Sequence, residues 1–369
     1  MVQHKFRVLL PVFFLISVVA AYGDTVRVAS FNVSLARKGP GLLLKDIMSG
    51  KDQQVDALVE IIQHMRPDIL LLNEFDHDYS GLALRAFLKI LAEGDAGITY
   101  PHSFAIAGNE GQPSGRDIDH DGRLGEWADA HGFGRFPGNG GMALLSRFPF
   151  DRDATRSFAQ LNWTPPIAGF DRMRLSSKSH WDIPVILPND QRLHVLASHP
   201  TPPVFDGPED LNGLRNDAEI GFWVSYLDKQ PQVDDNGASK PFAGKYFVLL
   251  GDLNNDPVDG EGLKTALSAL LRHALVSDPQ QRSEGAKTVA IAQAGANFDQ
   301  KGDPVFDTVD WGAKIGNMRV DYALPSVNLK ISDSGVFWPE PGEPFAAIIG
   351  EGREGATNHR MVWVDIQIN

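Results

Sequence analysis

Apolar residues along the chain follow two different periods, which predict strands alternating with helices. Residues 26–33 (VRVASFNV) are rich in β-forming side chains, and residues 52–65 predict the first helix. Its apolar positions fall at helical spacing and are Val55, Leu58, Val59, Ile62 and Met65. Pro67 ends this helix, and the apolar run 68–74 (DILLLNE) that follows is typical of a strand buried on both faces.

The same scheme repeats to the end of the chain. Further strands are predicted at 142–148, 193–199, 246–252, 318–324 and 361–368, with helices over roughly 214–228 and near 261–275. The last strand alternates strictly between apolar and polar residues. No internal repeat and no low-complexity linker interrupts the pattern. It therefore predicts one α/β domain in which two packed sheets carry helices on their outer sides.

The first 23 residues have the pattern of a secretory signal peptide. Lys5 and Arg7 precede an apolar run at 9–21, and small residues then offer cleavage after Ala21 or Gly23. A retained N-terminal anchor is the alternative. We expect an exported protein, periplasmic or extracellular, with residues 24–369 forming the domain and no membrane span after the signal is removed.

Composition narrows the class of protein. The 369 residues include no Cys, which excludes disulfides, thiolate nucleophiles and Cys-ligated zinc. The formal net charge is −13, and removal of residues 1–23 makes it more negative because they contain the basic residues Lys5 and Arg7 and no acid. Such a charge argues against a broad basic face for nucleic acid, since affinity for nucleic acid depends largely on phosphate neutralisation.

Polar side chains stand at or just past the ends of the predicted strands. They are Asn32, Glu74, His199, Asp252, Asn254 and Asp321, with Asn358 and His359 just before the last strand. Ligands of α/β sheets bind at strand ends, so we expect these residues to share one cleft. Carboxylate and amide oxygens suit Mg²⁺ or Mn²⁺, and imidazoles and amides suit a phosphoryl group. This set predicts metal-assisted attack of water on phosphorus.

The ordered motifs ASFN, LLNE, SHPTPP, GDLNNDP, RVDYAL and TNHR resemble those of the endonuclease/exonuclease/phosphatase superfamily. The resemblance covers about 26–369, including the SRFP run at 146–149. It implies a four-layer α/β/β/α sandwich. It also implies a hydrolase that acts on phosphate esters with a divalent metal.

The resemblance also assigns roles to single residues. Glu74 matches the principal metal ligand, with Asn32 beside it holding the metal or the phosphate. Asp252 matches the acid that orients or deprotonates the attacking water, and Asn254 matches an amide on the phosphoryl oxygen. Of the two imidazoles, His199 matches a phosphate donor. His359 matches the second one, which Asp321 orients and makes more basic.

One motif departs from the family pattern. The family usually has Ser-Asp-His at the last motif, whereas this chain has Thr357-Asn358-His359. The missing acid is commonly part of the metal shell, so we retain Asn358 as a candidate metal ligand through its carbonyl oxygen.

A second candidate metal site lies in the long 107–141 loop. Asp117, Asp119 and Asp121, with Gly122, match the first half of a calcium loop. Position twelve is Ala128, so Glu126 or Asp129 would have to complete it. Ca²⁺ bound within 117–129 and a merely solvated acidic loop both remain open.

We therefore expect an exported, metal-dependent phosphoesterase whose partner is a phosphate-ester substrate, with no stable protein partner evident. The alternatives are a secreted nuclease that degrades external nucleic acid and a non-catalytic Ca²⁺-binding protein on the same scaffold. A weaker feature is the segment 176–182, where Lys178 and His180 could line a substrate groove, although an exposed strand edge is the simpler expectation.

Overall fold

The computed structural model describes residues 25–168, 170–350 and 355–368. The predicted signal peptide at 1–23 lies outside these described residues. Within them, no helix has the length and apolar character needed to cross a membrane.

The larger sheet has six strands in the order β14-β15-β1-β2-β4-β3. Their bounds are β1 Thr25–Leu35, β2 Ile69–Phe75, β3 His102–Phe104, β4 Gly141–Ser146, β14 Lys330–Val336 and β15 Val362–Gln367. Strands β1 and β2 run parallel, and β15 pairs antiparallel with β1. The carboxyl-terminal ends of β1 and β2 therefore lie on the same side of the sheet, next to the first residues of β15.

The second sheet has five strands in the order β13-β12-β9-β8-β5. Their bounds are β5 Arg156–Ser157, β8 His180–Ile186, β9 Arg192–Ser198, β12 Tyr246–Asp252 and β13 Asp321–Pro325. Strands β9 and β12 are parallel, while β13 is antiparallel to β12. Two further two-stranded ribbons are β6 Asn162–Trp163 with β7 Met173–Arg174, and β10 Gln232–Val233 with β11 Ser239–Lys240.

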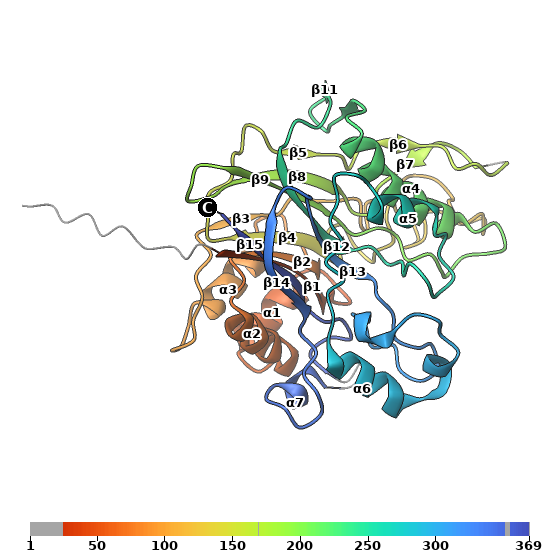
Figure 1. Cartoon of the computed structure of the whole chain (residues 1–369). Coiled ribbons are helices and arrows are strands. Elements are labelled where there is room, and N and C mark those ends of the chain that lie inside the picture. The colour runs from red at the N-terminus through yellow and green to blue at the C-terminus, as the bar shows by residue number, and fades with distance from the viewer. Residues whose placement is uncertain (1–24, 169, 351–354, 369) are drawn as a thin grey trace, which may run out of the picture.

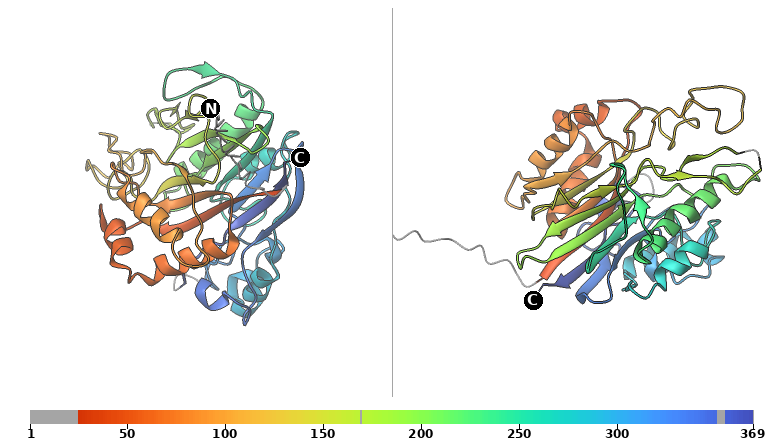
Figure 2. Two further views of the ribbon diagram at one scale, coloured as in Figure 1. Left: turned by 90° about the vertical axis from the view of Figure 1, so that its left-hand side faces the viewer. Right: turned by 90° about the horizontal axis from the view of Figure 1, so that it is seen from above.

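Helices cover the outer faces of both sheets (Figures 1 and 2). On the first sheet these are α1 Leu42–Ser49, α2 Gln53–Met65 and α3 Leu82–Leu91, and on the second α4 Leu211–Leu227 and α5 Thr265–Leu271. The remaining helical segments are α6 Glu284–Gln293, α7 Ala346–Ile349, η1 Gly295–Phe298 and η2 Pro304–Phe306. The predicted two-sheet α/β sandwich is confirmed.

Alternation along each strand divides the core into three layers. In β2, Ile69 and Leu71 face the space between the sheets, whereas Leu70 and Leu72 pack against the outer helices. The alternating residues of β15 predicted to share one face, from Val362 to Ile368, all join the central layer. A third cluster lies between the second sheet and α4 and α5.

Three local expectations differ from the structure. The helix expected near 261–275 spans only Thr265–Leu271, because the residues before it form turns around Asp256 and Gly260. Helices α1, α3 and α6 were not predicted. The segment expected as an exposed strand edge instead enters β8, which lies between β9 and β5, and His180 is only 1% exposed.

Candidate active site

The predicted catalytic side chains meet where the two sheets come together. Asp252, the last residue of β12, is the central group and is buried. Its Oδ2 accepts a hydrogen bond from Asn32 Nδ2 at 2.9 Å, and it lies 3.4 Å from His199 Nε2 and 3.8 Å from His359 Nε2. One carboxylate oxygen thus has an amide and two imidazoles around it.

Asp321 reaches this site differently from the sequence prediction. It was expected near the end of a strand, but it is the first residue of β13. Because β13 runs antiparallel to β12, its first residue pairs with the last residue of β12, Asp252. Asp321 Oδ2 lies 2.9 Å from His359 Nδ1 and also accepts a hydrogen bond from Thr308 Oγ1 at 2.9 Å. No sequence signal identified Thr308.

Burial and neighbouring charges set different protonation states for the acids and imidazoles. Burial raises the pKa of Asp252 to about 7, against the opposing charge of His359. Burial also opposes a charged His359, but the carboxylates of Asp321 and Asp252 outweigh it and raise its pKa to about 9. The pKa of His199 is held well below its usual range by burial, and further by Lys178 and His359. At neutral pH, His359 is a cation and His199 is neutral.

Glu74 lies in a β-bulge near the end of β2. Its φ is 58°, in the left-handed region, and the pairing of β2 with β4 shifts register between Asn73 and Phe75. A bulge of this kind redirects a side chain that would otherwise follow the alternation of the strand. Glu74 Oε1 lies 3.7 Å from His199 Nδ1 and 2.7 Å from Lys178 Nζ.

The two remaining predicted amides are held by the main chain. Asn254, also at positive φ, donates its backbone N–H to Asp252 Oδ1 and its Nδ2 to the Pro200 carbonyl, both at 2.9 Å. Asn358 is half-buried, and its backbone carbonyl accepts a hydrogen bond from Asp310 N. Thr357 Oγ1 donates to the Asn32 carbonyl at 3.0 Å, which joins the last motif to β1.

The groups present suit a divalent cation. Asp252, Asp321 and His359 place ligand atoms within 4.8 Å of one another, and while His359 is protonated it is the two carboxylates of this group that can ligate a cation. Two buried atoms of the site, His199 Nδ1 and Asp321 Oδ1, have no hydrogen-bond partner among the described residues. Unsatisfied buried polar atoms beside carboxylate oxygens are expected where a site is completed by an ion or a substrate.

The acidic loop brings together a set that differs from the predicted one. Asp117, Asp119 and Asp129 place ligand atoms within 4.8 Å of one another, whereas Asp121 is outside this group and accepts a hydrogen bond from Arg123 N. Asp129 was one of the two residues proposed to complete the loop. Its carboxylate is buried and accepts backbone N–H groups of Ile118 and Gly125 at 2.8 Å each.

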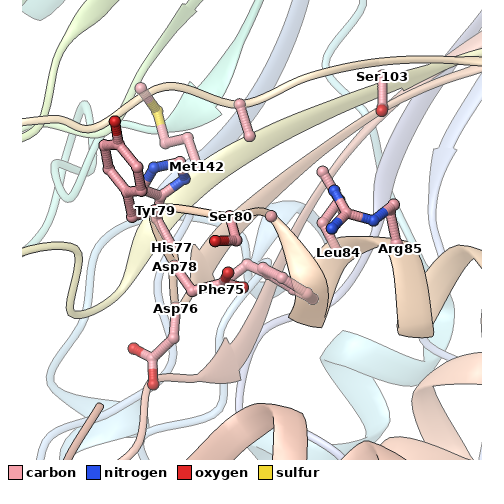
Figure 3. Close-up of a pocket in the computed structure, with 12 residues that line it drawn as sticks. Phe75, Asp76, His77, Asp78, Tyr79, Ser80, Leu84, Arg85, Ser103 and Met142 are labelled. Carbon is pink, nitrogen blue, oxygen red and sulfur yellow. The ribbon is translucent and has the colours of Figure 1, made fainter. Parts of the chain in front are cut away.

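A separate cavity of about 280 Å³ is lined by Phe75, the residue after Glu74, and by the residues that follow it (Figure 3). It lies between the start of α3 and strands β3 and β4, with the side chains of His77, Tyr79, Arg85 and Met142 around it. Its described lining contains none of the predicted site residues. Asp78 already caps the first turn of α3 by accepting from Leu82 N and Ala83 N.

Comparisons with known proteins agree with this architecture. A family model described as the Endonuclease/Exonuclease/phosphatase family matches residues 29–343. An endonuclease/exonuclease/phosphatase from Beutenbergia cavernae is 18% identical, with a TM-score of 0.53, covering 94% of this chain and 72% of that one. The human nocturnin catalytic domain is 14% identical, with a TM-score of 0.50, covering 94% of this chain and 95% of that one. No curated protein matches the sequence.

Proposed function

Because the chain belongs to the endonuclease/exonuclease/phosphatase family, we propose that it is an exported, divalent-metal-dependent hydrolase of phosphate esters. The observation that supports this most directly is the convergence of Asn32, His199 and His359 on the Asp252 carboxylate. Export rests on the sequence pattern of the first 23 residues alone.

Glu74 and the amide oxygen of Asn32 would hold the metal. Both are hard oxygen donors, and Glu74 is partly exposed at the site while its backbone is fixed by the bulge. Bound there, Mg²⁺ or Mn²⁺ would polarise the phosphoryl group and neutralise charge that develops in the transition state. Asn358 stays a candidate ligand.

The side chains of the protein can perform the proton and charge steps. Asp252, with a pKa raised to about 7, is suited to take a proton from the attacking water near neutral pH. His359 is protonated and can donate to a phosphoryl oxygen, while Asp321 holds its other nitrogen. Neutral His199 has one N–H to donate, and Asn254 keeps a second amide N–H beyond the one bound to Pro200.

A small ester is the substrate that the charge balance favours. The net charge of −13 gives the protein little long-range attraction for a nucleic-acid polyanion. We expect small phosphate esters to be hydrolysed with a weaker salt dependence than DNA.

The test is a hydrolysis panel with and without chelator, using p-nitrophenyl phosphate, bis-p-nitrophenyl phosphate, linear DNA and a phospholipid. We expect chelator-sensitive release of p-nitrophenol, reduced about 100-fold or more in Glu74→Gln because the metal ligand is lost. Glu60→Gln, on the exposed side of α2, is the matched control and should retain full activity. Undiminished turnover of Glu74→Gln at saturating metal would refute the metal assignment.

A further inference from the structure

Lys178 is a buried cation in this site. It stands two residues before β8, and its side chain is only 11% exposed. Its Nζ lies 2.7 Å from Glu74 Oε1 and donates to the Gly140 carbonyl at 2.6 Å. An ammonium group has three N–H donors, so these two contacts leave one for another acceptor.

The ammonium group contacts the acid proposed to hold the metal. It approaches the same oxygen of Glu74 that lies 3.7 Å from His199 Nδ1. Its charge is one of the causes that lower the pKa of His199, and the charge of Asp252 is one of those that act on Lys178. A cation that shares this oxygen of the metal-site acid with a phosphate-binding imidazole is suitably placed for contact with substrate oxygen.

Glu110 adds a second carboxylate beside this lysine. It is 1% exposed, and its Oε2 has no hydrogen-bond partner among the described residues. An amine 2.7 Å from a carboxylate oxygen and 2.6 Å from a carbonyl oxygen has only acceptors around it, which is the environment of an ammonium group.

The main chain fixes the position of Lys178 from both sides. The Lys178 carbonyl accepts from Asn109 N at 2.9 Å, and the preceding Ser177 donates its N–H and Oγ to Glu219 Oε1. Glu219 Oε2 accepts from Thr201 N, two residues after His199. One buried carboxylate on α4 thus sets the segments of Lys178 and His199 relative to each other, and a preorganised charge is the kind that contributes most to binding and catalysis.

We propose that Lys178 determines specificity by binding the third terminal oxygen of a phosphate monoester, so that the site accepts monoesters in preference to diesters. The inference rests on the proposed phosphoesterase function. A diester presents two terminal oxygens and one negative charge, whereas a monoester presents a third terminal oxygen and nearly a second charge at neutral pH. A point-charge lysine suits such an oxygen.

The experiment compares wild type with Lys178→Met on p-nitrophenyl phosphate and bis-p-nitrophenyl phosphate. We expect kcat/KM for the monoester to fall about 10- to 100-fold, with a change of less than about threefold for the diester. Lys245→Met removes an exposed lysine at the far end of β12 and should leave both values unchanged. Lys178→Gln serves as the second variant if Lys178→Met does not fold.

A binding measurement reads the same contact without turnover. In calorimetry with Mg²⁺ present, Lys178→Met should bind inorganic phosphate about tenfold more weakly and dimethyl phosphate as wild type does. An equal loss of kcat/KM on both esters would overturn the proposal. So would an unchanged ratio of the two kcat/KM values together with a lower half-saturating Mg²⁺ concentration, because Lys178 would then be a counter-ion that competes with the metal. If wild type hydrolyses neither ester, the proposed function fails, while phosphate binding still tests Lys178.

Discussion

Acid should destabilise the protein partly through His180, a buried imidazole outside the reacting groups. Its Nε2 lies 2.9 Å from the Glu219 carbonyl, which can only accept, so Nε2 carries the proton. Its Nδ1 lies 2.6 Å from Ser176 Oγ, and the ring packs against Phe222 and Trp223. Burial, opposed by the hydrogen bond to Glu219, lowers the pKa of His180 to about 4.

The sign and size of the effect follow from this pKa. In the unfolded chain an imidazole takes up a proton near pH 6.5, whereas folded His180 does so only near pH 4, so falling pH favours the unfolded state between these values. Linkage over that interval gives a loss of about 2 kcal/mol in unfolding free energy between pH 7 and pH 4.5. The stabilisation is fully present above about pH 6.5.

The assay is urea unfolding of wild type and His180→Gln at pH 7 and pH 4.5. The glutamine amide can still donate to the Glu219 carbonyl but does not titrate, so the variant should lose about 2 kcal/mol less than wild type over the same interval. Taking the difference between the two proteins cancels the contribution of the other titrating groups. His120→Gln, at an exposed position, is the control that should keep the wild-type pH dependence. Equal losses in wild type and His180→Gln would refute the reasoning.

Two further variants test a support of the active site and the acidic loop. Glu219 accepts three hydrogen bonds, and Glu219→Gln places an amide N–H against at least one of these donors. We expect the unfolding free energy to fall by about 2 kcal/mol and kcat to fall about tenfold. A variant with full kcat would show that Glu219 has a structural role only. If Asp117, Asp119 and Asp129 hold Ca²⁺, chelation should lower the melting temperature by about 2 °C, and Asp117→Asn/Asp119→Asn should abolish that response. A chelator response of the same size in both proteins would mean that the loop is only a solvated acidic turn.

The sequence predicted the strands best where one period extends over a whole element. β2 and β15 were recognised from a continuous run and from strict alternation, because these patterns follow directly from which faces are buried. Helices α1 and α3 are short, and the N-cap residue of each is a glycine in the left-handed region, which has no side chain to cap the helix. Without a capping side chain at that position or a long apolar stripe, their sequences gave little local signal.

The candidate site was predictable in its residue types but not in its connections. Asp321 was expected at the wrong end of its strand. The end of β13 that lies at the site depends on its antiparallel pairing with β12, a long-range contact that the local sequence does not show. Lys178 was expected at an exposed edge for a similar reason. Only the position of β8 inside the sheet, and the bulge that redirects Glu74, bring that lysine to the acid.

Several residues in or beside the site are held in backbone conformations that oppose local preference. Ser34, Glu74 and Asn254 all have positive φ, a conformation that costs a non-glycine residue about 1–3 kcal/mol. Unpaired buried atoms of His199 and Asp321 add a further cost that folding alone does not recover. Three apolar layers stabilise the domain enough to hold these groups, and a ligand that engages the unpaired atoms would relieve part of the cost. Strain and unsatisfied polarity therefore coincide with the predicted chemistry, as expected of a site shaped for a ligand rather than for stability.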